Sequence, residues 1–266
     1  MTRIALGVEY DGSGYSGWQR QHHAETVQAR LEQALSAVAC HPVVTMAAGR
    51  TDTGVHACEQ VVHFDTHAER PDRAWVRGVN AHLPADIGVR WVVQSVNGFD
   101  ARRSAESRRY RYLLVDRPTQ PVLLRNRVGW TWRSLALEPM QQAAMALLGE
   151  HDFSSFRAAA CQSRHPHRRV DALDVERRDG VIVFDIRANA FLHHMVRNIV
   201  GTLMRVGAGD YPPEWVEQVL AARDRRRAGV TAPATGLYLV AVDYPARFGL
   251  PVPPDGPVFA LARGDG

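Results

Sequence analysis

The strongest constraint on the fold is an order of strand and helix patterns that occurs twice along the chain. In the first part, alternating or continuous apolar segments predict strands at 4–10, 43–48, 60–65 and 87–94. Apolar residues at helical spacing predict helices at 26–40 and 71–82. The order is therefore strand, helix, strand, strand, helix, strand, which is typical of an α+β fold.

A second run of similar order follows. It contains predicted strands at 109–115, 170–176, 181–188 and 237–242, and predicted helices at 138–148, 193–206 and 213–222. The middle two of these strands form a hairpin across Asp179-Gly180. Two α+β halves of similar order predict a pseudo-symmetric protein with a cleft between its halves, where functional sites are favoured. We assign residues 1–105 and 106–245 to the halves, and the Pro- and Gly-rich residues 246–266 to a loosely packed tail.

Composition limits the chemistry that the chain can perform. All 32 cationic residues are arginine, which excludes a Schiff-base lysine, a P-loop lysine and a lysine general base. The cysteines, Cys40, Cys58 and Cys161, are odd in number and lack C-x-x-C spacing, so we expect neither a disulfide framework nor a zinc site. No apolar stretch approaches the roughly 18 residues of a membrane span, and the N-terminal residues lack a signal-peptide pattern. We therefore expect a cytoplasmic protein.

Residues 48–57, between two predicted strands, have the composition of a catalytic loop. They place one carboxylate, Asp52, and one guanidinium, Arg50, among two hydroxyls and two glycines. Strand ends hold such a loop rigidly. The charge of Arg50 favours the ionised form of Asp52, which suits a nucleophile or an electrostatic group. An ordinary Asx-type turn at Asp-Thr-Gly is the alternative, and composition alone does not choose between them.

A glycine-rich loop follows the first predicted strand. Its Gly12, Gly14 and Gly17 match the G-x-G-x-x-G pattern of a dinucleotide-binding loop. The pattern fails on context, because the helix should open at the third glycine and instead begins about nine residues later. The alternative is a loop whose backbone approaches a ligand or another chain, with Tyr15 and Trp18 as candidate stacking groups.

Two further motifs also fail on context. An aspartic protease needs two Asp-Thr/Ser-Gly motifs whose carboxylates share a proton, and the chain has one. His63 and His67 are four residues apart but lie on or beside a predicted strand, so they do not share a helical face as a metal pair requires. Pairs such as His22-His23 and His193-His194 are more typical of surface or core histidines. No metal site is predicted.

Arginine clusters interleaved with aromatic residues and histidines indicate RNA binding. The clusters are Arg102-Arg103, Arg108-Arg109 with Arg111, Arg164 with Arg168-Arg169, and Arg223 with Arg225 to Arg227. Looped or single-stranded nucleic acid needs positive charge for its phosphates and aromatic rings for its splayed bases. Any one cluster is equally typical of a solvated surface. Four clusters together favour contact with RNA.

Two predicted elements supply candidate neighbours for Asp52. On the strand 109–115, Tyr110 and Tyr112 share one face and the arginines share the other, so a tyrosine pair beside a carboxylate could hold a flipped base. In the helix 193–206, Arg197 lies one turn from the first two histidines. If that helical face meets the cleft, Arg197 can pair with Asp52.

Residues 49–57 resemble the active-site motif of the TruA-type tRNA pseudouridine synthases. Further similarities, in the order of the family, are Tyr10-Asp11-Gly12, Gly17-Trp18-Gln19-Arg20-Gln21, Arg109-Tyr110-Arg111-Tyr112, the segment from Phe191 to Asn198, and Gly236-Leu237-Tyr238-Leu239. These segments extend over nearly the whole chain up to about residue 244, and the set is highly specific. The Arg- and Pro-rich detail of the tail departs from the family and leaves the role of the tail open.

The resemblance implies a fold and a reaction. The fold is the pseudouridine synthase fold, a two-lobed α+β arrangement in which two pseudo-symmetric halves with mainly antiparallel sheets form one extended mixed sheet. Helices lie on its outer face and the active-site cleft lies between the halves. The reaction is isomerisation of uridine to pseudouridine at positions 38, 39 and 40 in the anticodon stem-loop of tRNAs, without cofactor or metal. The enzyme breaks the glycosidic bond, rotates the uracil and rejoins it through C5.

By motif match, Asp52 is the catalytic aspartate. It either attacks ribose C1′ or removes the C2′ proton to give a glycal, and both routes need an ionised carboxylate. Tyr110 would stack on the target base and assist proton removal at C5, while Arg50 would help to open the stem by taking the place of the flipped nucleotide or its phosphate. The remaining catalytic or substrate-binding residues are Arg197, Leu237 and Arg20, and the expected RNA-binding surface comprises Arg108, Arg109, Arg111, Arg164, Arg168 and Arg169.

The resemblance also implies partners. Enzymes of this type form homodimers with RNA across both subunits, so we expect a homodimer that binds tRNA, with no membrane contact and no nucleotide cofactor. Two competing hypotheses are a catalytically silent RNA-binding protein of the same fold and a nucleotide-cofactor enzyme that uses the glycine-rich loop. Release of tritium from uracil C5 of labelled tRNA separates the isomerase from the silent protein, and thermal protection by NAD or ATP but not by tRNA would favour the third hypothesis.

Overall fold

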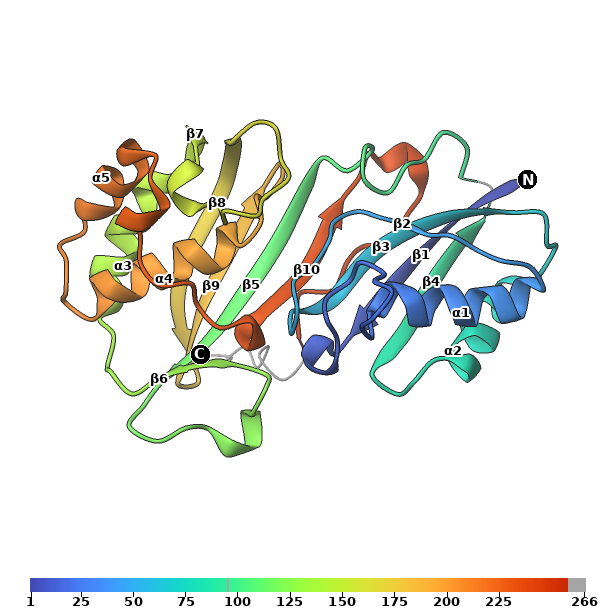
Figure 1. Cartoon of the computed structure of the whole chain (residues 1–266), viewed down its shortest axis with the longest axis horizontal. Coiled ribbons are helices and arrows are strands. Elements are labelled where there is room, and N and C mark those ends of the chain that lie inside the picture. Colours follow the sequence, from blue (N-terminus) through green and yellow to red (C-terminus); the bar gives the residue numbers. More distant parts are fainter. Residues whose placement is uncertain (95, 258–266) are drawn as a thin grey trace. The chain divides into compact units, whose positions relative to one another are not determined.

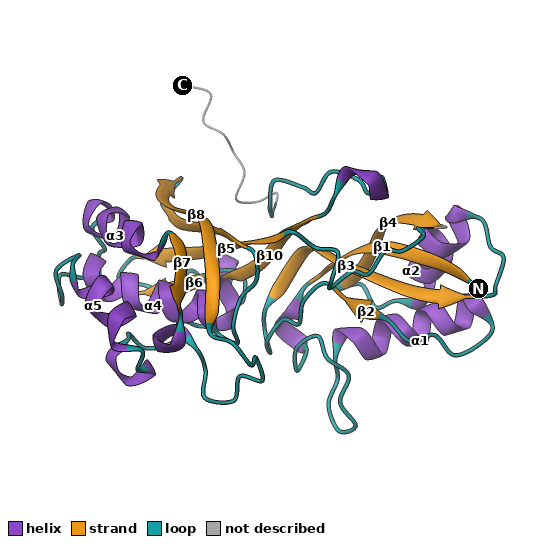
Figure 2. Ribbon diagram, turned by 90° about the horizontal axis from the view of Figure 1, so that it is seen from above, coloured by secondary structure: helices purple, strands orange, loops and turns teal. Residues whose placement is uncertain are grey.

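The computed structural model describes residues 1–94 and 96–257, and it confirms the predicted α+β class (Figure 1). The described chain forms two compact units. Unit 1 comprises Met1–Glu106 with Tyr238–Pro257, and unit 2 comprises Ser107–Leu237. Each unit combines a mixed, mainly antiparallel sheet with helices that cover one face of that sheet (Figure 2). None of the helices in the described part of the chain has the length and apolarity that a membrane span requires.

Unit 1 contains the sheet β4-β1-β3-β10, with β2 beside β3. Its strands are β1 (Thr2–Tyr10), β2 (Met46–Ala47), β3 (His56–Thr66), β4 (Ile87–Gln94) and β10 (Leu237–Asp243). The predicted helix at 26–40 is α1 (Val27–Ala39), and the predicted helix at 71–82 is a π-helical turn (Ala74–Gly78) followed by α2 (Val79–His82). Both helix predictions and the strand at 87–94 are therefore confirmed.

The core of unit 1 includes β1, in which residues 4–8 are all buried. Ile4, Leu6 and Val8 are fully buried and alternate onto one side of the strand, and α1, which lies along the sheet (Figure 1), buries Leu31 and Leu35. A strand with one apolar face needs such a helix to exclude water from it. This packing fixes the end of β1, where the glycine-rich loop begins.

The predicted strand at 43–48 is wrong in length, because only Met46–Ala47 pair with β3. The backbone before β2 makes its hydrogen bonds to side chains of α1 instead. The N–H of Val43 donates to the Ser36 hydroxyl (2.9 Å), and the N–H of Thr45 donates to the Glu32 carboxylate (2.8 Å). Backbone groups satisfied by a helix have no need of a strand partner.

Unit 2 contains the sheet β5-β9-β8-β7, with the short β6 parallel to β5. Its strands are β5 (Ser107–Asp116), β6 (Gly129–Thr131), β7 (Gly149–Asp152), β8 (His167–Arg178) and β9 (Val181–Ala188), and its helices are α3 (Leu137–Ala144), α4 (Met195–Gly207) and α5 (Trp215–Ala222). The predicted β8–β9 hairpin is confirmed, since Asp179 and Gly180 both have positive φ, as a tight turn between two strands requires. The sequence patterns missed β6 and β7, which have three and four residues.

The final strand differs from the predicted division of the chain. Residues 106–245 were expected to form one half, but β10 pairs in parallel with β3 of unit 1, with Tyr238 opposite His56. The first residues of the predicted loose tail also pack in unit 1. The ring of Phe248 lies 5.2 Å from that of Phe99. Just before the tail, the Tyr244 hydroxyl donates to the Ala101 carbonyl (2.6 Å). Residues 258–266 of the tail lie outside the described residues.

The sheet face of unit 1 opposite α1 holds a buried carboxylate, Glu59, which is 2% exposed. It accepts hydrogen bonds from the indole N–H of Trp91 and from Arg90 (3.0 Å). Gly7 makes room for the indole, because a Cβ there would lie 2.1 Å from the Trp91 Nε1. Burial raises the pKa of Glu59 to about 7.

This raised pKa predicts a pH-dependent stability. Between the ordinary glutamate pKa and about 7 the folded chain binds a proton that the unfolded chain has released, so rising pH lowers the free energy of unfolding. From pH 5 to pH 8 this group should lower that free energy by about 2–3 kcal/mol. Glu59→Gln should lose that part of the pH dependence in urea unfolding, whereas Glu69→Gln at an exposed site should keep it. Equal pH profiles for Glu59→Gln and the wild type would contradict the assignment.

Candidate active site

The predicted catalytic loop, residues 48–55, connects β2 to β3 in unit 1. The N–H of Val55 donates to the carbonyl of Asp52 (3.1 Å), and Gly54 has φ of +78°. A type II turn requires a positive φ at this third position. Asp52 is half-buried, between buried Thr51 and exposed Thr53. The turn alternative is thus correct for the backbone, and it is compatible with a functional carboxylate.

The glycine-rich loop packs directly against this turn. A Cβ on Gly12 would lie 1.9 Å from the Val55 carbonyl oxygen, and a Cβ on Gly17 would lie 2.7 Å from the Thr51 oxygen. The N–H of Trp18 donates to Thr51 (3.0 Å), and the N–H of Gly54 donates to the carbonyl of Tyr15 (3.3 Å). The glycines therefore allow two backbone segments of the same chain to approach each other closely.

Two expectations for the glycine-rich loop need correction. Trp18 and Tyr15 were candidate stacking groups for a ligand, but Trp18 is 1% exposed and Tyr15 is 7% exposed. The Trp18 ring lies 5.8 Å from that of Tyr10 and the Tyr15 hydroxyl donates to Asp86 (2.7 Å), so both side chains are already used within the fold. The rejection of a dinucleotide-binding loop agrees with the structure, since a short 3-10 turn (Gly12–Gly14) follows β1 and α1 begins only at Val27.

The neighbouring strand holds the other side of the catalytic loop. The Gln60 side chain donates to the carbonyl of Gly49 (2.8 Å), and the N–H of Ala48 donates to the carbonyl of Val61 (2.8 Å). Both partners lie on β3, which pairs with β1 and β10 on its two sides. The loop is thus fastened on both sides of Asp52, as a preorganised catalytic group requires.

His56 is a functional candidate that the sequence reasoning left unassigned. It begins β3 directly after the loop and is buried. Its Nδ1 lies 3.0 Å from a carboxylate oxygen of Asp11, and its ring stacks on Tyr238 of β10 at 4.7 Å. His56 therefore joins the glycine-rich loop, the catalytic loop and β10. Its place within the quoted motif was the available signal.

Arg20, a predicted substrate-binding residue of unit 1, is held by an ion pair. Its guanidinium donates to Glu32 of α1 (2.9 Å), yet 57% of its side chain is exposed. Glu32 itself is buried and also accepts from Gln28 and Thr45. A buried carboxylate thus holds one side of an exposed guanidinium. Arg50, in the catalytic loop, is exposed.

In unit 2, the two tyrosines of β5 have different surroundings. Tyr110 is 8% exposed and meets Phe191 edge to face at 5.1 Å. Tyr112 is fully buried, and its ring fills the space beside Gly129 and Gly236, where a Cβ would lie 2.4 Å and 2.8 Å from it. Tyr112 is therefore a core residue, so the expected tyrosine pair around a flipped base is wrong.

The arginines of β5 are also less available than the sequence suggested. Arg109 and Arg111 share one strand face, as predicted, and both form ion pairs with Asp185 of β9 (2.7 and 2.6 Å). Arg111 is 3% exposed. This burial contradicts its place on an RNA-binding surface, because the carboxylate of Asp185 already neutralises and covers it.

The remaining predicted arginines of unit 2 differ in setting. Arg164 is exposed, and Arg169 is exposed beside its ion-pair partner Asp171 (2.7 Å). Arg168 is half-buried and donates to the carbonyls of His165 (2.9 Å) and His167 (2.6 Å), so it shapes its own loop. Arg108 is half-buried and donates to the carbonyl of Asn189 (3.0 Å).

Arg197 lies in the first turn of α4. Its Nε donates to the carbonyl of Ala232 (2.8 Å), and the N–H of Ala232 donates to the Arg197 carbonyl (3.1 Å). These two bonds fix the segment that leads to Leu237, the buried first residue of β10. The expected pairing of Arg197 with Asp52 stays a prediction.

Asn198, the next residue of α4, is a buried hub that the sequence reasoning missed. Its amide donates to the Phe156 carbonyl (2.7 Å) and accepts from Arg225 (3.0 Å) and Thr231 (2.7 Å). Arg225, counted as part of an RNA-binding cluster, therefore supports the fold. A polar residue inside an apolar helical stripe was the available signal.

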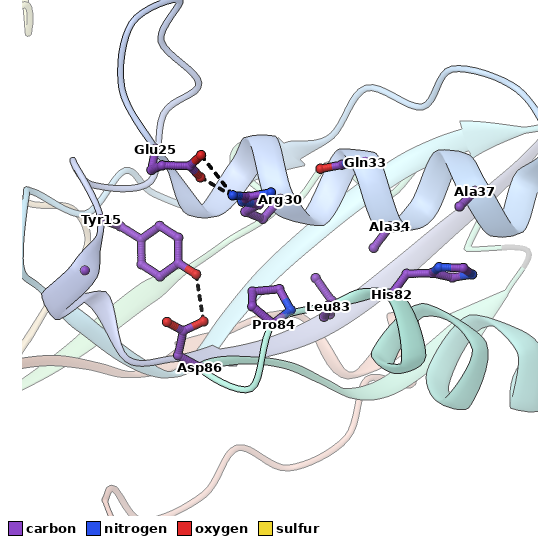
Figure 3. Close-up of a pocket in the computed structure, with 11 residues that line it drawn as sticks. Tyr15, Glu25, Arg30, Gln33, Ala34, Ala37, His82, Leu83, Pro84 and Asp86 are labelled. Carbon is purple, nitrogen blue, oxygen red and sulfur yellow. Dashed lines mark hydrogen bonds and ion pairs between the residues drawn. The ribbon is translucent and has the colours of Figure 1, made fainter.

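Unit 1 also contains a groove of about 640 Å³ between α1, α2 and the glycine-rich loop (Figure 3). At one end the Tyr15 hydroxyl donates to Asp86 (2.7 Å), and at its rim Arg30 forms a bidentate ion pair with Glu25. Two carboxylates against one guanidinium make it an unfavourable place for phosphates. The groove therefore does not extend the expected RNA-binding surface.

Comparison with known proteins decides the family. A family model described as tRNA pseudouridine synthase matches residues 7–102 and 143–245. The protein named tRNA pseudouridine synthase A from Enterobacter sp. (strain 638) is 56% identical over 257 residues, which are 97% of this chain and 95% of that protein. The protein of the same name from Aeromonas hydrophila is 57% identical over 257 residues, covering 97% and 96%. The chain belongs to the tRNA pseudouridine synthase family.

Membership in the tRNA pseudouridine synthase family confirms the resemblance seen in the sequence and the predicted isomerase acting on tRNA. The two matched ranges contain the catalytic loop, Arg20, Arg197 and Leu237. Tyr110 lies between them.

The close approach of the two loops predicts a contrast between two glycines of one turn. Gly12→Ala should destabilise this tRNA pseudouridine synthase by about 1–3 kcal/mol, because its Cβ would overlap the Val55 carbonyl. Gly14→Ala should change stability by less than about 0.5 kcal/mol, because a Cβ there meets nothing within 4 Å. Urea unfolding measures both. Equal effects of the two substitutions would show that the loops do not pack as described.

Proposed function

We propose that the chain isomerises uridine to pseudouridine at positions 38, 39 and 40 in the anticodon stem-loop of tRNA, with the carboxylate of Asp52 as the catalytic group. The observation that carries the proposal is the fixed setting of Asp52. On either side of it, the carbonyl of Thr51 accepts a hydrogen bond from Trp18, and the N–H of Gly54 donates to the carbonyl of Tyr15. The Gln60 side chain donates to the carbonyl of Gly49 earlier in the loop. A half-buried carboxylate on such a loop keeps its position while a substrate rearranges around it.

The proposed reaction needs no external electron or atom. The bond between ribose C1′ and uracil N1 breaks, the uracil rotates, and a bond forms between C1′ and C5. The proton on C5 leaves and N1 regains one, so product and substrate are isomers. Asp52 either attacks C1′ or removes the C2′ proton, and both routes start from its carboxylate form. We expect the reaction to need neither cofactor nor metal.

Two residues of unit 2 are proposed to act on the substrate with Asp52. Tyr110, which is 8% exposed, would stack on the target base and assist proton removal at C5. Arg197, whose Nε is already fixed by Ala232, would bind the substrate or pair with Asp52. Leu237 would contact the base, since it begins the strand that follows the segment held by Arg197.

RNA binding is proposed for the exposed arginines. Arg20 and Arg50 would bind beside the reacting nucleotide, with Arg50 taking the place of the flipped base or its phosphate. Arg164 and Arg169 are exposed in unit 2, and Arg108 and Arg109 are partly exposed. Arg111 is left out because it is buried against Asp185. Shape and phosphate contacts would select the substrate, because paired RNA offers side chains little readable sequence.

The proposal includes a homodimer that binds tRNA across both subunits and acts in the cytoplasm. Arginines proposed for RNA binding lie in each of the two units, and a second subunit would add further arginines for contact with one tRNA. Light scattering of the purified protein with and without tRNA measures the assembly.

Replacement of the catalytic carboxylate tests the proposed function. Asp52→Asn should reduce release of tritium from uracil C5 of labelled tRNA by at least about 10³-fold, because neither route proceeds without the carboxylate. Its Kd for tRNA should change less than about threefold, since phosphate contacts dominate binding. Asp65→Asn, at the far end of β3 beside Arg3, should keep wild-type turnover.

Two outcomes would contradict this proposal. Full turnover by Asp52→Asn would exclude the carboxylate from the reaction. A wild-type protein that binds tRNA without releasing tritium would be the catalytically silent RNA-binding protein.

The salt dependence of tRNA binding tests the role of Arg20. Arg20→Gln should weaken tRNA binding and reduce the slope of log K against log salt concentration by about 0.7–0.9, the loss of one phosphate contact. Arg30→Gln is the matched control, because Arg30 also pairs with a single carboxylate of unit 1 but at the groove. An unchanged slope for Arg20→Gln would remove Arg20 from the interface.

A further inference from the structure

We propose that Tyr10 and Thr51 are positioning residues, whose mutual hydrogen bond fixes the backbone immediately before Asp52. The inference rests on the proposed function, in which Asp52 is the catalytic group. It adds two residues to which the sequence motifs assigned no role in the reaction. Neither hydroxyl touches the reacting atoms in this proposal, and both act through the place of the Asp52 carboxylate.

The contact joins two buried hydroxyls. The Tyr10 phenol lies 2.7 Å from the Thr51 Oγ1, and either atom can be the donor. Tyr10 is 4% exposed and Thr51 is 7% exposed. Burial raises the pKa of Tyr10, so the phenol stays protonated and the bond is between neutral groups. A buried hydroxyl that loses its partner has no water to replace it.

The end of β1 is shaped to deliver Tyr10 to this place. Tyr10 is the last residue of the strand, and the pairing of β1 with β3 shifts register between Val8 and Tyr10. Register shifts of this kind redirect side chains and are common beside active sites. The apolar residues before Tyr10 anchor the strand in the core. The phenol therefore projects from a rigid element.

Thr51 is held on its backbone as well as on its side chain. The N–H of Trp18 donates to the Thr51 carbonyl (3.0 Å), and the Trp18 ring lies 5.8 Å from that of Tyr10. The carbonyl of Trp18 in turn accepts from Gln28 in the first turn of α1 (3.0 Å). Thr51 is thus tied to β1 by its hydroxyl and to α1 through Trp18. The next residue along the chain is Asp52.

A positioning role and a purely structural role give different kinetics. If the hydroxyl pair only stabilises the fold, its loss lowers the denaturation midpoint while the folded enzyme keeps its kcat. If the pair positions Asp52, folded enzyme binds tRNA as before but turns over slowly, because small displacements of a catalytic group cost rate. A fall in kcat without a change in Kd therefore indicates a positioning role, and an unchanged kcat indicates a purely structural one.

The test measures kcat for tritium release at saturating tRNA, the Kd for tRNA, and unfolding for a set of hydroxyl variants. Tyr10→Phe and Thr51→Val should each lower kcat by about 10–100-fold, with Kd within about twofold of wild type. Thr51→Ser retains the hydroxyl and should stay within about threefold of wild-type kcat. The double variant should lose little more than Tyr10→Phe alone, since that substitution already removes the bond to Thr51 together with the contact of the phenol to Gln60.

Tyr244→Phe is the matched control, because it removes a tyrosine hydroxyl bond of unit 1 at the Ala101 carbonyl, and its kcat should not change. Rates are normalised to the folded protein that binds tRNA. If one single variant does not fold, the other and Thr51→Ser still decide the outcome.

Wild-type kcat in Tyr10→Phe and Thr51→Val would overturn the positioning role, as would a loss that Thr51→Ser shares in full. If Asp52→Asn is inactive while Tyr10→Phe is fully active, the positioning role alone fails. If Asp52→Asn itself turns over, the proposed function fails.

Discussion

The close approach of two backbones is the interaction on which the loop around Asp52 depends. The loop after β1 and the loop before β3 touch at Gly12 and Gly17, where a Cβ would overlap carbonyl oxygens of Val55 and Thr51. Hydrogen bonds then connect the two loops at Trp18 and Gly54. Because β1 and β3 are neighbours in one sheet, the strands bring the loops together and the glycines permit contact. Asp52 obtains its fixed position from this arrangement.

The arginines show why a basic sequence overstates a nucleic-acid surface. Arg111 is buried against Asp185, Arg225 supports Asn198, and Arg168 donates to carbonyls of its own loop. Guanidinium groups offer five donors and are readily used inside a fold. Arg20 is the contrasting case, since a buried glutamate holds one side of the group while most of its side chain remains exposed. Exposure and partners, rather than the number of arginines, decide which residues can bind phosphate.

The sequence predicted the elements whose apolar patterns extend over many residues. The helix α1, the strand β4 and the β8–β9 hairpin agree with prediction because their burial patterns extend over several turns or pairs. The strands β6 and β7 are too short to show a period, and β2 is shortened because α1 side chains take its backbone bonds. The placement of β10 beside β3 depends on contacts between residues about 180 positions apart, which no local pattern contains.

The loop around Asp52 could be located in the sequence, but which of the aromatic residues are buried could not be predicted. Asp52 and its loop follow from composition, whereas the burial of Tyr112 and Trp18 follows from packing that the alternation of residues cannot reveal. The loop around Asp52 should therefore be rigid before tRNA binds. Amide hydrogen exchange of Trp18 and Gly54 in the free protein tests it most directly. Protection similar to that of β1 and β3 amides is predicted, and exchange as fast as that of the exposed residues 21–23 would contradict the account.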